Sequence, residues 1–168
     1  LAVSAGLAGL CLAQEATSSA SELPSGQEQL KALAYFIGGW ELTGEITLAG
    51  QPTMKLVFER QFKWDLGNNF IQTTTTEMKD GKSELRHRSM IGWEAKPQRI
   101  TECGFWNANL PIDLPAEMER VTWSKEGENW RIEKEGVSGL FTIIDMNTHK
   151  YECTFRGDDG SDNSWHYT

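Results

Sequence analysis

The chain has 168 residues and a formal net charge of -8, a length that suits one domain with its own hydrophobic core. Hydrophobic residues make up 39% and charged residues 24%, which is the composition of a soluble globular protein. The acidity argues against a nucleic-acid partner, which a basic face would attract. It equally disfavours binding to an anionic membrane surface.

The first residues predict an export signal. Residues 1–13 are apolar and small, and Cys11-Leu12-Ala13 forms a small-x-small cleavage pattern before Gln14. Residues 14–27 follow as a polar, flexible leader. No later stretch is long and apolar enough to span a bilayer. We therefore expect a periplasmic or extracellular protein with one domain over residues 28–168; a buried N-terminal helix is the alternative.

One short helix is predicted at the start of the domain, where Leu30, Leu33 and Phe36 recur at helical spacing before Gly38 and Gly39. Strands follow at the intervals of hairpins, with turn residues between them. They are predicted over residues 40–48, 53–64, 70–78, 83–93, 99–106, 117–125, 130–136, 140–146 and 151–156. Residues 164–168 form a last strand or its beginning.

Consecutive strands with short loops predict an all-β fold, a single antiparallel up-and-down β-barrel of about nine or ten strands with a short N-terminal capping helix. An open sheet of this size would leave exposed edges, and closure into a barrel removes them. A barrel of about eight strands or more has room inside for packed side chains or for one small ligand.

A Gly-x-Trp motif, Gly38-Gly39-Trp40, stands where the predicted helix meets the first strand. It resembles the motif of the lipocalin and fatty-acid-binding barrels at the same place. The resemblance implies a lipocalin-like barrel in which glycine allows a sharp turn. It also implies that Trp40 packs across the closed end of the barrel, near the helix that plugs it. An unrelated meander with a buried tryptophan is the alternative.

A second motif, Gly92-Trp93, resembles a hairpin of a bacterial lipocalin-like domain family of unknown function. The match is partial, because Glu94 and Ile100 replace the family's usual aspartate and aromatic residue. The resemblance makes Gly38, Gly39, Trp40, Gly92 and Trp93 structural residues.

Aromatic side chains spread over most predicted strands, and we expect them to form the core and to line part of the lumen. An apolar pocket with a few polar groups is typical of small-molecule sites. The predicted ligand-binding residues are His87, Thr74, Thr76, Gln72, Phe58, Phe105, Trp123 and Tyr151. Packing of the core alone is the alternative for the aromatic members.

The chain has three histidines, and none belongs to an HxH or HExxH pattern. His149 is predicted at the surface, in a turn. His166 lies near the C-terminus, where nitrobindin-type barrels, related in shape, bind haem through a histidine, but no further pattern supports haem. The acidic run at 157–163 lacks the register of a calcium loop. No cofactor and no metal site are therefore predicted.

Two cysteines, Cys103 and Cys153, remain in the predicted domain, and both share a strand face with aromatic neighbours. We expect both to point inward. Whether they form a disulfide is left open, because the distance between their Cα atoms decides it.

Three functions follow in order of preference. The first is non-catalytic binding of a small apolar or amphipathic molecule. The second is a structural or assembly module whose lumen is filled by its own side chains. The third is an enzyme on the same barrel with His87 as general base, although no G-x-S-x-G elbow is present. The ligand and the oligomeric state are left open.

Overall fold

A computed structural model of the protein describes residues 26–79, 82–107, 118–157 and 160–168. The predicted signal segment, almost all of the predicted leader, and the acidic pair at 158–159 lie outside these residues. No helix in the described part of the chain has the length and apolar character needed to cross a membrane.

Two short helical segments precede ten strands in the described residues. The predicted single helix is a turn of α-helix, α1 (Gly26–Leu30), followed by a 3-10 helix, η1 (Lys31–Phe36). The strands are β1 (Gly38–Thr47), β2 (Met54–Asp65), β3 (Phe70–Lys79), β4 (Lys82–Glu94), β5 (Arg99–Trp106), β6 (Met118–Glu126), β7 (Asn129–Lys134), β8 (Val137–Asp145), β9 (Thr148–Arg156) and β10 (Asp162–Tyr167). The predicted strands are all present, and the C-terminal residues complete β10.

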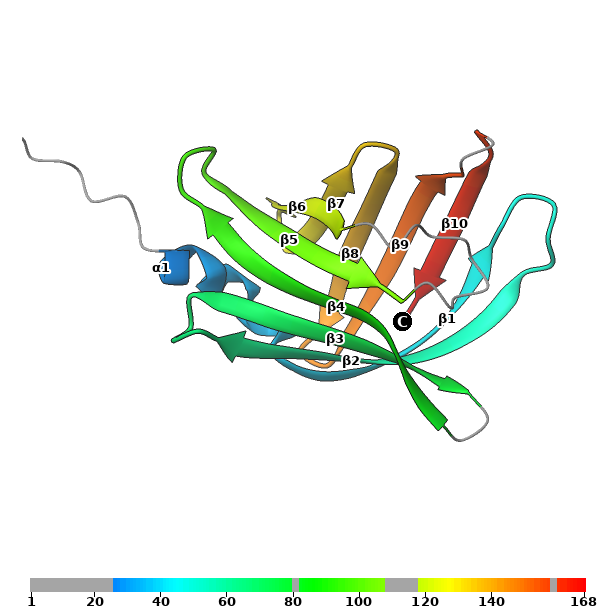
Figure 1. The fold of residues 1–168 in the computed structure, drawn as a ribbon, viewed down its shortest axis with the longest axis horizontal. Helices are drawn as coiled ribbons and strands as arrows, with labels where there is room; N and C mark the ends of the chain where they lie inside the picture. The colour runs from blue at the N-terminus through cyan, green and yellow to red at the C-terminus, as the bar shows by residue number, and fades with distance from the viewer. Residues whose placement is uncertain (1–25, 80–81, 108–117, 158–159) are drawn as a thin grey trace, which may run out of the picture.

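The strands form a closed antiparallel barrel in which neighbours in sequence are neighbours in space (Figure 1). The barrel closes where β1 pairs with β10, from Gly44 opposite Tyr167 to Thr47 opposite Ser164. The two strands approach closely at this seam. A Cβ on Gly44 would lie 2.0 Å from the carbonyl oxygen of His166, so glycine is required there.

The helical segments plug one end of the barrel. Leu30, Leu33 and Phe36 are buried, and the Phe36 ring lies 5.5 Å from that of Trp123 and 5.7 Å from that of Phe62. These aromatic contacts join the plug to the core formed by the strands, so the end of the lumen next to the helices is filled.

Trp40 lies at this plugged end. Its indole Nε1 donates a hydrogen bond to the Phe36 carbonyl oxygen at 2.8 Å, and its ring packs against Tyr35 and His149. The backbone enters β1 through Gly38, whose φ is +135°. The tryptophan therefore ties the end of η1 to the first strand.

The second glycine-tryptophan pair lies on β4. The Phe70 ring occupies the space that a side chain at position 92 would need, since a Cβ on Gly92 would lie 2.7 Å from the ring. Trp93 is partly buried against the core and lies beside Gly26 at the start of α1. Both residues thus serve packing at the plugged end.

Candidate functional site

The half of the lumen away from the helices contains a cavity of about 270 Å³. Its walls come from all ten described strands of the barrel. They are formed by Leu42, Ile46, Phe58, Arg60, Thr75, His87, Glu102, Gly104, Trp106, Met118, Glu119, Arg120, Val121, Ile132, Lys134, Val137, Tyr151, Cys153, Phe155, Trp165 and Tyr167. Most of these are apolar, and most of the charged ones belong to two groups.

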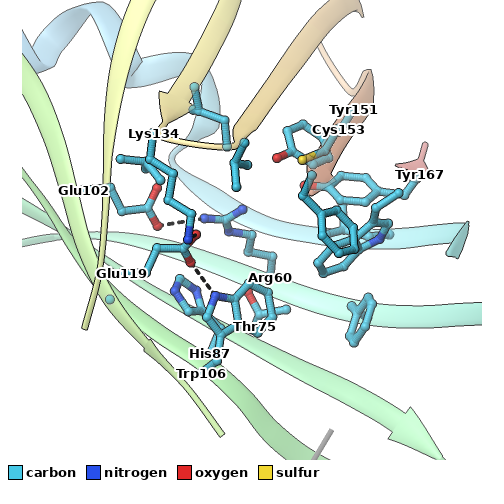
Figure 2. A pocket seen from close by; sticks show the side chains of 18 of the residues that line it. Arg60, Thr75, His87, Glu102, Trp106, Glu119, Lys134, Tyr151, Cys153 and Tyr167 are labelled. Carbon is cyan, nitrogen blue, oxygen red and sulfur yellow. Dashed lines mark hydrogen bonds and ion pairs between the residues drawn. The ribbon is translucent and has the colours of Figure 1, made fainter. Parts of the chain in front are cut away.

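The first polar group is centred on Glu102 of β5, which is buried (Figure 2). Its carboxylate pairs with Arg60 of β2, at 3.1 Å between Oε1 and Nη2. It also accepts hydrogen bonds from Ser89 Oγ at 2.5 Å and from Trp123 Nε1 at 2.9 Å. The Thr73 hydroxyl lies 2.5 Å from Ser89 Oγ. Three donors around one carboxylate fit its ionised, acceptor-only form.

Arg60 carries a full positive charge inside the barrel. Burial alone would lower its pKa, but the charge of Glu102, together with a hydrogen bond to Tyr167, raises it above its usual value. The guanidinium also lies 4.8 Å from the centre of the Phe62 ring, a cation–π contact. Its Nε is buried and has no hydrogen-bond partner among the described residues.

The second polar group is centred on Glu119 of β6. Lys134 Nζ lies 2.9 Å from its carboxylate, and the indole of Trp106 donates to it (Figure 2). Burial would raise the pKa of Glu119, but these hydrogen bonds lower it below its usual value. His87 stacks on Trp106 with 4.5 Å between ring centres, and burial lowers its pKa to about 4. Gly104 leaves space for this imidazole, because a Cβ there would lie 2.4 Å from His87 Nε2.

Two stacked tyrosines form a third part of the wall. The rings of Tyr151 and Tyr167 lie 4.8 Å apart. Burial raises the pKa of Tyr167 to about 12 and that of Tyr151 well above its usual value, so both phenols are protonated and can donate. Gly139 makes room for the phenol, since a Cβ at this position would lie 2.5 Å from Tyr151 Oη.

Three of the predicted ligand-binding residues, His87, Phe58 and Tyr151, line this cavity. A fourth, Trp123, is buried in the adjacent core and reaches the site through its hydrogen bond to Glu102. The structure therefore brings together residues from four separate strands, as expected of a lumen site.

The other predicted ligand-binding residues face away from the cavity. Thr74 and Thr76 line a separate groove on the outer wall, and Gln72 shares their face of β3. On this strand Thr73 and Thr75 are the buried threonines. A run of four threonines gives no contrast between the two faces of the strand, so the sequence alone does not show which threonines face inward.

Phe105 also lies outside, with 57% of its surface exposed. On β5 the inward residues are instead Glu102, Gly104 and Trp106. An inward carboxylate and an outward phenylalanine reverse the usual hydrophobic pattern, because Glu102 has internal partners for its charge.

The charged residues of the cavity were missed by sequence reasoning. Arg60 alternates with the inward Phe58 and Phe62, and this spacing could have placed it inside. No comparable signal exists for Glu102 or Glu119, because charged side chains on strands are usually exposed. Their burial depends on partners from other strands.

His149 is buried rather than exposed, which corrects the prediction of a surface turn. It lies at the start of β9 among Tyr35, Phe36, Trp40 and other rings. Burial, with a smaller effect of Arg60, lowers its pKa to about 4, and its Nδ1 has no partner in the described structure. His166, by contrast, is exposed on β10.

The two cysteines lie on opposite faces of the barrel wall. Cys153 lines the cavity, whereas Cys103 follows the inward Glu102 and points outward. Both thiols are free. The expectation that both point inward is wrong for Cys103, for the same reason that Phe105 lies outside.

No protein-family model matches the chain, and the comparison with curated proteins finds no match. Among solved structures, the chain is similar to the crystal structure of Rv2717c from M. tuberculosis, with a TM-score of 0.56 and 14% sequence identity. The alignment covers 82% of this chain and 94% of that chain. At this identity the likeness shows the barrel fold alone.

Proposed function

We propose that this protein is a lipocalin-like barrel that binds a small amphipathic molecule in its lumen without catalysing a reaction. The cavity of about 270 Å³ carries this proposal. Apolar side chains make up most of its wall, and a few buried polar groups are held in place by partners. Cavities of this kind are typical of small-molecule sites.

The cavity also favours binding over the two alternatives. A structural module with a filled lumen would leave no such space. An enzyme with His87 as general base would need that imidazole to accept a proton readily. Its pKa of about 4 makes it a weak base, and none of the described carboxylates hydrogen-bonds to it.

Burial of the ligand's apolar body would supply most of the affinity, at about 25 cal/mol per Å² of apolar surface removed from water. The polar groups would fix its orientation. Because they are tied to several strands, they lose little freedom when the ligand binds, which limits the entropic cost of binding.

Native mass spectrometry of the purified protein tests the proposal first, and we expect an additional mass from a co-purified small molecule. A displaceable apolar fluorescent probe then gives an affinity. Val137→Phe should fill part of the cavity and weaken probe binding at least tenfold. Val57→Phe, on the outer wall, is the matched control and should bind as the wild type does. Equal binding by both variants would contradict a lumen site.

Export remains part of the proposal, on the strength of the apolar residues 1–13. We expect the protein recovered from the cells that make it to begin at Gln14. Intact mass measurement checks this, and a mature chain that retains residues 1–13 would contradict it.

A further inference from the structure

We infer that the ligand is electrically neutral and that its polar group accepts hydrogen bonds, as an ester or ketone carbonyl does. This inference rests on the proposed function and specifies the class of ligand. The argument uses two observations: the charged side chains around the cavity are already in ion pairs, and some hydrogen-bond donors there have no acceptor.

The positive charges around the cavity are all neutralised. Among the described residues, three cationic side chains line it, and each has a carboxylate within ion-pair distance. The pairs are Arg60 with Glu102 at 3.1 Å, Lys134 with Glu119 at 2.9 Å, and Arg120 with Glu94. The site therefore offers no unpaired charge to an ionic ligand.

An anionic ligand would have to compete with Glu102 for Arg60. Glu102 cannot withdraw easily, because Ser89 and Trp123 also hold its carboxylate. The anion would bring an additional charge into a largely apolar space, and its desolvation would not be compensated. A cationic ligand meets the same difficulty, since Glu102 and Glu119 already have partners.

Hydrogen-bond donors, in contrast, remain without an acceptor in the described wall of the cavity: Arg60 Nε and Trp165 Nε1 are buried and have no partner there. Arg60 has five N–H groups, and its Nε–H has no partner among the described side chains. The phenols of Tyr151 and Tyr167 are protonated; that of Tyr151 interacts with Cys153, whereas Tyr167 takes part in a hydrogen bond with Arg60 through its oxygen and keeps its O–H to donate. The two lining carboxylates are used by other residues. Figure 2 shows Arg60, the tyrosines and the second polar group around one space, so a carbonyl oxygen would find donors there.

The body of the ligand meets aromatic rings. Phe58, Trp106, Phe155 and Trp165 line the cavity in addition to the tyrosines. Flat aromatic molecules stack well on such walls, with a gain of about 0.5–1.5 kcal/mol per favourable ring pair beyond burial. A naphthalene ring is thus a suitable probe body for testing the polar group.

Three matched probes test the inference on the wild-type protein at pH 7.5: 2-acetylnaphthalene, 2-naphthoate and 2-naphthylmethylammonium. They share a ring system and differ mainly in charge. Isothermal titration calorimetry should show the neutral ketone binding at least tenfold more tightly than either ion. Equal or tighter binding of the carboxylate would overturn the inference and leave the proposed function intact. No binding by any probe would contradict both the inference and the proposed binding function.

Variants of the central ion pair give a second test. Glu102→Gln removes the counter-charge of Arg60, and we expect the preference to shift at least tenfold toward 2-naphthoate. Arg60→Met combined with Glu102→Gln removes both charges and the guanidinium donor. The double variant should therefore show neither the shift toward 2-naphthoate nor the wild-type preference for the ketone. Glu126→Gln breaks an exposed ion pair with Arg131 outside the cavity and should keep the wild-type preference. An unchanged preference in folded Glu102→Gln protein would overturn the role assigned to the pair. If that variant does not fold, the three probes on the wild type decide alone.

Discussion

Gly38 and Gly39 are adjacent at the start of β1, but their backbones differ. Gly38 has a φ of +135°, a conformation that side chains rarely adopt, whereas Gly39 does not have a positive φ. A Cβ on Gly39 would meet the flexible end of Gln61 at 3.3 Å. The turn from helix to strand therefore depends on the first glycine of the motif.

We expect Gly38→Ala to lower the free energy of unfolding by about 1–3 kcal/mol, because alanine would be strained at this φ. Gly39→Ala is the matched control and should change it by less than about 0.5 kcal/mol. Urea denaturation of both variants measures the difference. Equal destabilisation by the two substitutions would contradict this account.

The buried His149 makes stability depend on pH. Its pKa is about 4 in the folded protein and about 6.5 in an unfolded chain. Between these values the unfolded state binds more protons, so stability is complete above pH 6.5 and is lost as the pH falls toward 4. His87 has a folded pKa of about 4 as well and acts in the same direction.

His149→Leu should therefore flatten the pH dependence of stability. We expect the wild type to lose at most about 3 kcal/mol through this residue between pH 7 and pH 4, at 1.36 kcal/mol for each unit of pKa shift and less where solvent screens the charge. The free energy of unfolding of the variant should fall by that much less over the same range. At pH 7 the variant should be no less stable than the wild type, because the unpartnered Nδ1 is removed. Urea titrations across this range provide the measurement. His166→Gln, at an exposed site, should keep the wild-type profile.

Among the secondary-structure elements, the 3-10 helix η1 plugs one end of the barrel through its buried side chains. Phe36 is 1% exposed and contacts rings from β2, β6, β8 and β9. Tyr35, its neighbour, donates from its hydroxyl to the Thr148 carbonyl oxygen at 3.0 Å. A short helical segment thus joins strands that are far apart around the barrel.

Phe36→Ala should lower the free energy of unfolding by about 3–5 kcal/mol, because it leaves a cavity at the centre of this packing. Tyr35→Phe removes one partly buried hydrogen bond and should cost about 1 kcal/mol. Chemical denaturation compares the two. If Phe36→Ala cost no more than Tyr35→Phe, the helix would be an appendage rather than part of the core.

The polar group centred on Glu102 also joins several strands. It joins β2, β4, β5 and β6 through Arg60, Ser89 and Trp123, and Thr73 adds β3. Glu102 and Arg60 line the cavity, and Trp123 packs against Phe36 of the plug. Because three donors hold the Glu102 carboxylate, the group can form a rigid polar floor for the cavity.

In the molecule as a whole, closure of the barrel separates two environments for side chains, the lumen and the outer surface. Cys153 belongs to the first and Cys103 to the second. The barrel is closed by backbone pairing around the whole ring, including the short β1–β10 seam, and no disulfide joins these two thiols.

A reducing agent should therefore leave the melting temperature unchanged to within about 1 °C. In the native protein, a thiol reagent should modify Cys103 faster than Cys153, because Cys153 is buried and burial raises the pKa of its thiol. Peptide mass mapping after timed labelling identifies the order. Faster labelling of Cys153 would contradict the assignment of the two faces.

Strand number, strand order and the short helix could be predicted because they depend on local features. Turn residues and runs of alternating side chains mark each hairpin, and closure removes the exposed edges that a meander of this length would otherwise have. The faces of β3 and β5 could not be predicted. In β3 four threonines look alike on both faces, and in β5 the carboxylate of Glu102 faces inward.

Local pattern thus suffices for the hairpins, since each is set by residues that are neighbours in the chain. The site depends on contacts between strands that are distant in sequence: Glu102 is stable inside because Arg60, Ser89 and Trp123 surround it. His149 is buried because η1 folds over it. The burial of a charged or polar side chain depends on the partners that closure brings to it, and only the folded barrel supplies them.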